Sequence, residues 1–148
     1  MALFEPVDFT TELPFTARST TLARQLLRYH LRAAGAPREL SENAQLVLHE
    51  LISNCVDHAY PCPNDTLRLS WQVSAARVDV TVTDHGPHPR CPRCHPGTVD
   101  GGPAEIAASV PAEDAPRGRG LLIVEGLSEQ WKVTTSGTAT TVQATITV

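Results

Sequence analysis

The sequence predicts an α+β fold, a two-layer sandwich in which a mixed sheet is covered on one face by helices. Two observations support this prediction. Apolar residues recur with a 3.6-residue period over 16–34 and again over 38–58, which is typical of amphipathic helices. Apolar and polar residues alternate in paired segments on both sides of a long irregular stretch, which is typical of β-hairpins. We expect residues 1–148 to form a single domain.

The first part of the chain predicts one strand and one helix. Residues 7–13 alternate weakly, and Pro14 ends this strand. Thr16 or Ser19 would cap a helix that runs to about Ala34, just before a glycine. The expected apolar stripe of this helix consists of Leu22, Leu26 and Tyr29.

A second helix is expected from about Arg38 to His58. Pro37 suits its first turn, where a missing N–H leaves no helical hydrogen bond unmade, and Pro61 follows its end. Its expected buried face consists of Leu40, Ala44, Val47, Leu48, Leu51, Ile52 and Cys55.

The rest of the chain predicts two hairpins, a lid and a short helix. Residues 67–73 and 78–82 alternate with period two and predict a hairpin with one buried face. The segment at about 87–117 is rich in Pro and Gly, and a loop of this length is typically a functional lid. A helix and a closing hairpin are expected at 121–128, 131–135 and 140–148.

Composition excludes several classes of protein. The net charge is −4 and no basic stripe occurs, which argues against nucleic acid as a partner. No apolar run reaches the roughly 18 residues of a membrane span, and no signal-peptide pattern is present, so we expect a cytoplasmic protein. Lys132 is the only lysine, and no G-x-x-x-x-G-K-[ST] motif occurs, which excludes a P-loop.

The most informative segment lies inside the second helix and contains Glu50 and Asn54. Residues four apart lie one turn apart on the same helix face, so these two side chains would share a polar face. A carboxylate and a carboxamide in this arrangement can hold a divalent cation and a reacting hydroxyl or water. A surface helix without any chemistry could carry the same residues, so the motif needs support from elsewhere in the chain.

Two glycine motifs supply that support. Asp84-His85-Gly86 follows a predicted strand, and glycine there allows close approach of a ligand to the backbone. Gly118-Arg119-Gly120-Leu121 opens the short helix, where free backbone N–H groups favour phosphate and Arg119 adds positive charge. Taken singly, the first motif is also an ordinary turn and the second a flexible hinge.

In this order, the three motifs resemble the N box and the first two glycine boxes of the GHKL ATP-binding fold, the Bergerat-type fold of gyrase-type ATPases, Hsp90, MutL and histidine kinases. The runs 54–60 and 120–125 look most like bacterial anti-sigma-factor serine/threonine kinases. The resemblance implies binding of ATP and Mg²⁺, binding of a sigma factor, and phosphorylation of a serine on a STAS-type antagonist. Related kinases are often homodimers.

The resemblance also implies a role for each matching residue. Glu50 would be the catalytic base for the serine hydroxyl, and Asn54 would be the Mg²⁺ ligand. Asp84 would accept a hydrogen bond from the adenine amine, and Thr141 would support this aspartate through water. The remaining nucleotide-binding residues would be Gly86, Gly118, Arg119, Gly120 and Leu121.

Departures from the family pattern leave other functions open. Pro87 follows Gly86, the third glycine box near Gly137 is degraded, and the acidic Asp57 stands where many members have a basic residue. These departures favour a nucleotide-dependent binding module without kinase turnover, so whether the protein is an enzyme stays open.

A second alternative is a zinc-stabilised regulatory domain with a vestigial nucleotide site. The segment 91–95 contains a C-x-x-C followed by histidine, a spacing that zinc prefers. No second C-x-x-C occurs, and a cytoplasmic protein keeps its cysteines reduced. We therefore expect free thiols at Cys55, Cys62, Cys91 and Cys94.

Overall fold

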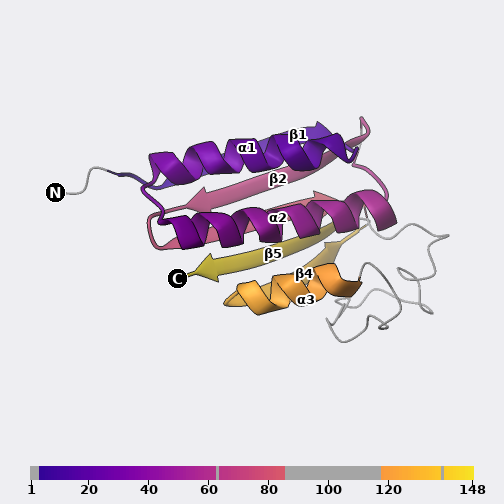
Figure 1. Cartoon of the computed structure of the whole chain (residues 1–148). Helices are drawn as coiled ribbons and strands as arrows, with labels where there is room; N and C mark the ends of the chain where they lie inside the picture. Colours follow the sequence, from indigo (N-terminus) through magenta and orange to yellow (C-terminus); the bar gives the residue numbers. More distant parts are fainter. Residues whose placement is uncertain (1–3, 63, 86–117, 138) are drawn as a thin grey trace.

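The described part of the chain forms five strands and three helices in two layers (Figure 1). The computed structural model describes residues 4–62, 64–85, 118–137 and 139–148. Within 118–137, it describes the side chains from residue 122 onward. The predicted lid and Gly86 lie outside these ranges. The elements are β1 (Val7–Pro14), α1 (Arg18–Ala33), α2 (Arg38–His58), β2 (Thr66–Val73), β3 (Arg77–Asp84), α3 (Gly118–Leu127), β4 (Gln130–Ser136) and β5 (Ala139–Thr147).

The strands form one sheet in the order β1-β2-β3-β5-β4, and every neighbouring pair is antiparallel. The predicted α+β two-layer sandwich is confirmed, but the expected mixed sheet is wrong in this detail. The reason lies in the connection between β1 and β2. Because α1 and α2 follow each other as a helical hairpin, the chain crosses the sheet twice and returns to the end where β1 finished. Thr66 therefore pairs with Pro14.

All three helices cover the same face of the sheet, with α2 between α1 and α3 (Figure 1). The alternation predicted for β2 and β3 holds residue by residue, and so does the predicted buried face of α2. Val124 of α3 and Ile146 of β5 close the core, each fully buried. No helix in the described part of the chain combines the length and the apolar character needed to cross a bilayer.

Helix α1 turns a different face inward from the one we expected. Leu22 is 45% exposed and Tyr29 is 70% exposed, so these two residues of the predicted stripe lie toward solvent, whereas Leu26 is partly buried against the core. The inward face is formed by Ser19, Thr20, Ala23, Leu27 and Leu31. Both sets have helical spacing, and the small residues of the second set allow the helix to approach the sheet closely. No side chain caps this helix at its first residue, and Ser19 donates instead to the carbonyl of Pro14.

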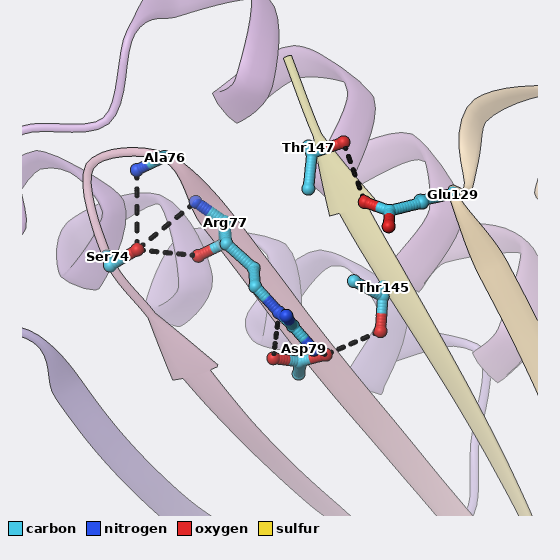
Figure 2. Close-up of polar contacts among 7 residues, drawn as sticks. All are labelled: Ser74, Ala76, Arg77, Asp79, Glu129, Thr145 and Thr147. Atoms are coloured by element: carbon cyan, nitrogen blue, oxygen red, sulfur yellow. Dashed lines mark hydrogen bonds and ion pairs between the residues drawn. The ribbon is translucent and has the colours of Figure 1, made fainter.

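The opposite face of the sheet carries polar side chains that contact one another across strands. Figure 2 shows Asp79 of β3 accepting from Arg77 at 2.9 Å and from the Thr145 hydroxyl of β5. In the turn before β3, the Ser74 hydroxyl accepts from the backbone N–H of Arg77 at 3.1 Å, which holds the register of the β2–β3 hairpin (Figure 2). This face is therefore organised by hydrogen bonds, whereas the helix face is organised by apolar packing.

One histidine joins α1 to the sheet. The indole N–H of Trp71 donates to Nδ1 of His30 at 2.9 Å, and Phe9 stacks on Trp71 with ring centroids 5.2 Å apart. Partial burial lowers the pKa of His30 below its usual value. The hydrogen bond requires an unprotonated Nδ1, so geometry and burial both favour the neutral ring.

The observed orientation of α1 predicts a contrast between two leucines of this helix. Leu27→Ala removes a fully buried side chain and should lower the free energy of unfolding by about 2–5 kcal/mol. Leu22→Ala, on the exposed stripe, should change it by less than about 0.5 kcal/mol. Urea unfolding followed by circular dichroism measures both. A larger loss for Leu22→Ala would contradict the observed orientation.

The His30–Trp71 contact predicts a loss of stability in mild acid. Because the pKa of His30 is lower in the folded chain, the unfolded chain binds the proton first as the pH falls below about 6.5. The free energy of unfolding should therefore decrease from pH 7.5 to pH 5.5, and this decrease should be smaller in His30→Gln. Urea titrations at both pH values measure the difference, and identical pH profiles for the two proteins would refute the assignment.

Candidate functional site

Glu50 and Asn54 lie on α2 at the border between its buried face and solvent. Both side chains are half-buried, and the neighbours Leu51 and Cys55 point into the core. Residues four apart are about 6 Å apart along a helix axis, so the two polar groups can contact a single ligand. Asp57, near the next turn, is exposed.

Asp84 is the last residue of β3 and is only 5% exposed. It continues the alternation of Val80 and Val82, so its side chain lies on the helix-covered face of the sheet. The thiol of Cys55 donates to its Oδ2 at 3.0 Å. Since Cys55 directly follows Asn54, this contact brings the predicted adenine acceptor to the helix turn that carries the predicted metal ligand.

The thiol at this contact is held in its protonated form. Burial raises the pKa of Cys55 well above its usual value, and the negative charge of Asp84 raises it further. The pKa of Cys62 is also raised, first by burial and then by the same carboxylate. Both residues are free thiols in the structure, whereas Cys91 and Cys94 lie outside the described residues.

Further contacts hold the segment after α2 against the end of β3. The backbone N–H of His85 donates to the carbonyl of Tyr60 at 2.9 Å. The thiol of Cys62 donates to the carbonyl of Thr83 at 3.5 Å. Together with Cys55–Asp84, these contacts join α2 and β3 at the end of the sheet where the D-x-G motif begins.

The structure places Thr141 on the other face of the sheet from Asp84. Its hydroxyl lies 3.0 Å from the hydroxyl of Thr83, on the face of the sheet that the helices do not cover. Asp84 pairs with Thr140 in the β3–β5 register, and directly paired residues share a face. Thr140, and not Thr141, therefore shares a face of the sheet with Asp84. The apolar residues Val142, Ala144 and Ile146 have the parity of Thr140, so the alternation of β5 could have identified it.

The second glycine motif forms the first turn of α3. Gly118, Gly120 and Leu121 lie within this helix, which begins three residues earlier than predicted. Helix α3 begins at the end of the molecule where α2 and β3 both finish (Figure 1). The backbone thus places a helix N-terminus at the same end as Asn54 and Asp84. The side chain of Arg119 is outside the described part.

The side chains around Asn54 suit a metal ion that takes most of its ligands from a bound nucleotide and from water. Within the described residues, no group of three or more His, Cys, Asp or Glu side chains is arranged to hold a metal ion. Asn54 offers one neutral oxygen, which suits Mg²⁺ whose other ligands are phosphate oxygens and water. The zinc alternative stays a prediction, because residues 91–95 lie outside the described ranges.

A separate hollow of about 290 Å³ lies on the opposite face of the sheet. Its polar lining comes from side chains that point away from the helices, such as Ser70, Gln72 and Asp79. None of the predicted site residues lines it. The candidate nucleotide site around Asn54 and Asp84 is therefore distinct from this hollow.

Solved structures share this fold. The RsbU and RsbW domains of Rv1364c from Mycobacterium tuberculosis match with a TM-score of 0.63 and 18% identity. The match covers 97% of this chain but only 32% of the length of that chain. SiaB–SiaC complex from Pseudomonas aeruginosa matches with a TM-score of 0.62 and 15% identity, covering 93% of this chain and 88% of that one. At these identities the likeness concerns the fold alone.

The family is shown by sequence. No curated protein sequence matches this chain. The family model described as histidine kinase-like ATPase domain matches residues 13–146, which is most of the chain and includes all three motifs. The resemblance to the GHKL fold is thereby confirmed, and the chain belongs to the histidine kinase-like ATPase domain family.

Proposed function

We propose that this protein is a cytoplasmic ATP-binding regulator of the anti-sigma-factor kinase type. In this proposal it phosphorylates a serine on a STAS-type antagonist and sequesters a sigma factor. The observation that carries the proposal is the contact between Cys55 and Asp84. It joins a buried carboxylate suited to adenine with the helix turn that carries Glu50 and Asn54, in a chain of the histidine kinase-like ATPase family.

Asp84 recognises the adenine base in this proposal. A carboxylate only accepts hydrogen bonds, and the exocyclic amine of adenine donates them. The carboxylate is almost fully buried, where hydrogen bonds are stronger than in water. Guanine presents a carbonyl where adenine has its amine, so Asp84 favours adenine. Thr140, paired with Asp84 across β3 and β5, is the neighbour that supports it.

Asn54 holds the magnesium ion of the bound nucleotide. When bound, Mg²⁺ neutralises part of the negative charge of the triphosphate. The carboxamide oxygen of Asn54 is a neutral ligand, so it adds no further repulsion to the phosphates. The first turn of α3, with Gly118 and Gly120, supplies backbone N–H groups at a helix N-terminus that favours phosphate.

Glu50 orients and deprotonates the serine hydroxyl of the protein substrate. It lies one helical turn before Asn54 on the same face of α2 and is half-buried. A general base of this kind contributes about 10²–10⁴ to the rate. The presence of this carboxylate favours a kinase over a module that only binds nucleotide.

The exposed surface of helix α1 favours the proposal of a protein partner. Its sequence contains four arginines and no acidic residue, although the chain as a whole carries a net charge of −4. Arg18, Arg24, Arg28 and Arg32 are all exposed, beside the exposed Leu22 and Tyr29, so this helix carries a local basic cluster although the sequence as a whole predicts no basic stripe. A cationic surface with apolar side chains suits an acidic protein surface, such as the sigma factor or antagonist of this proposal.

We extend the proposal to a homodimer, which the mass of the protein in solution would test.

A nucleotide-dependent binding module without turnover is the second candidate. Asp57 favours it, because an acidic side chain near the turn that follows Asn54 opposes the negative charge of a triphosphate. The two candidates differ in phosphate transfer and agree in ATP binding.

The metal role of Asn54 predicts a selective loss of magnesium-dependent binding. Asn54→Ala should remove most of the increase in ATP affinity that Mg²⁺ produces, because the carboxamide ligand is gone. Calorimetric titration of ATP with and without Mg²⁺ measures this increase. Asn43→Ala is a matched control, a half-buried asparagine on the same helix about three turns earlier. Unchanged magnesium dependence in Asn54→Ala would remove this residue from the metal site.

The role of Glu50 predicts that its substitution affects phosphate transfer but not ATP binding. Glu50→Gln should lower transfer of labelled phosphate from ATP to a STAS-domain protein by about 10²–10⁴, with ATP affinity close to that of the wild type. Glu39→Gln, an exposed glutamate in the first turn of α2, is the control. Wild-type protein that binds ATP without any transfer would instead support the binding module.

A further inference from the structure

We infer that Cys55 is a positioning residue for nucleotide recognition, whose thiol holds the Asp84 carboxylate in the orientation that accepts the adenine amine. This inference rests on the proposed binding of ATP. It adds to that proposal a residue of α2 that acts on the base through Asp84 and not by its own contact with the ligand.

The geometry at this contact is that of a directed hydrogen bond inside the core. Sγ of Cys55 lies 3.0 Å from Oδ2 of Asp84, and the two residues are 4% and 5% exposed. A buried carboxylate is costly unless donors surround it, so a donor at this position lowers the free-energy cost of burying Asp84. A carboxylate has about four lone-pair sites, and one bond from the thiol therefore leaves it able to accept others.

The contact sets the orientation of the carboxylate before a nucleotide arrives. Asp84 ends a strand, and the bond from Cys55 to its Oδ2 ties the carboxylate to a helix as well as to its own strand. This second attachment narrows the range of orientations of the carboxylate. Preorganisation of this kind increases affinity, because the cost of ordering the group is met during folding and not during binding.

The orientation of the carboxylate also affects selectivity between bases. Inosine triphosphate differs from ATP in having a carbonyl in place of the exocyclic amine, so a fixed carboxylate opposes it acceptor against acceptor. Without the bond from Cys55 the carboxylate is held less firmly and opposes that carbonyl less strongly. Loss of the thiol should then weaken ATP binding more than inosine triphosphate binding.

A second cysteine in the same region supplies a matched control. Cys62 is also buried and free, but its thiol donates to the backbone carbonyl of Thr83 and not to the carboxylate. Substitution of Cys62 therefore removes a buried thiol close to Asp84 while leaving the Cys55–Asp84 bond in place.

The test measures ATP and inosine triphosphate affinity by calorimetry, at constant Mg²⁺, for wild type, Cys55→Ala, Cys55→Ser and Cys62→Ala. Cys55→Ala should weaken ATP binding about tenfold, equivalent to roughly 1.4 kcal/mol, and should lower the ratio of ATP to inosine triphosphate affinity. Cys55→Ser keeps a donor, so its ATP affinity and its ratio of ATP to inosine triphosphate affinity should lie within about twofold of wild type. Both quantities should also lie within about twofold of wild type in Cys62→Ala. Urea unfolding confirms that each variant is folded. Should Cys55→Ala not fold, Cys55→Val, which lacks a donor and keeps the volume, takes its place.

The outcomes separate this inference from the proposal beneath it. Wild-type protein that fails to bind ATP overturns the proposed function, and the inference with it. Wild-type protein that binds ATP, with Cys55→Ala equal to it in affinity and selectivity, overturns the inference alone. Equal weakening for both nucleotides, without rescue by serine, assigns Cys55 to packing only and also overturns the inference.

Discussion

A buried carboxylate is costly unless donors surround it, and the hydrogen bond from Cys55 supplies Asp84 with a donor inside the core. The arrangement of the candidate site depends on this bond. It connects α2 to the end of β3 through two residues that are 29 positions apart along the chain. Backbone bonding between His85 and Tyr60 reinforces the same junction. The junction holds α2 with Cys55 toward the end of β3, and Asn54 is the residue of the helix directly before it.

The two faces of the sheet divide the molecule by chemistry. Apolar side chains from alternate positions of β2 and β3 pack against α2, and Asp84 enters this layer at its edge. The uncovered face is held by polar pairs such as Asp79 with Thr145. A one-residue difference in a strand thus moves a side chain from one chemical environment to the other. That is why Thr140 and Thr141, adjacent in sequence, belong to different faces.

The quality of the sequence-based predictions followed the strength of each pattern. In α2, seven buried residues repeat without a competing stripe, and the predicted face agrees with the structure residue by residue. In α1, two stripes have the same spacing, and the small residues Ser19, Thr20 and Ala23 that face the sheet carry little hydrophobic signal. The larger Leu22 and Tyr29 gave the stronger signal and lie toward solvent.

The sequence by itself determined the order of elements, the core positions of α2, β2 and β3, and the three motifs that mark the family, because period and spacing are local properties of a chain. Only the tertiary structure decided which face of α1 is buried and that a thiol of α2 bonds to the Asp84 carboxylate. These features arise from packing between distant segments. No local pattern encodes the rotation of one element against another.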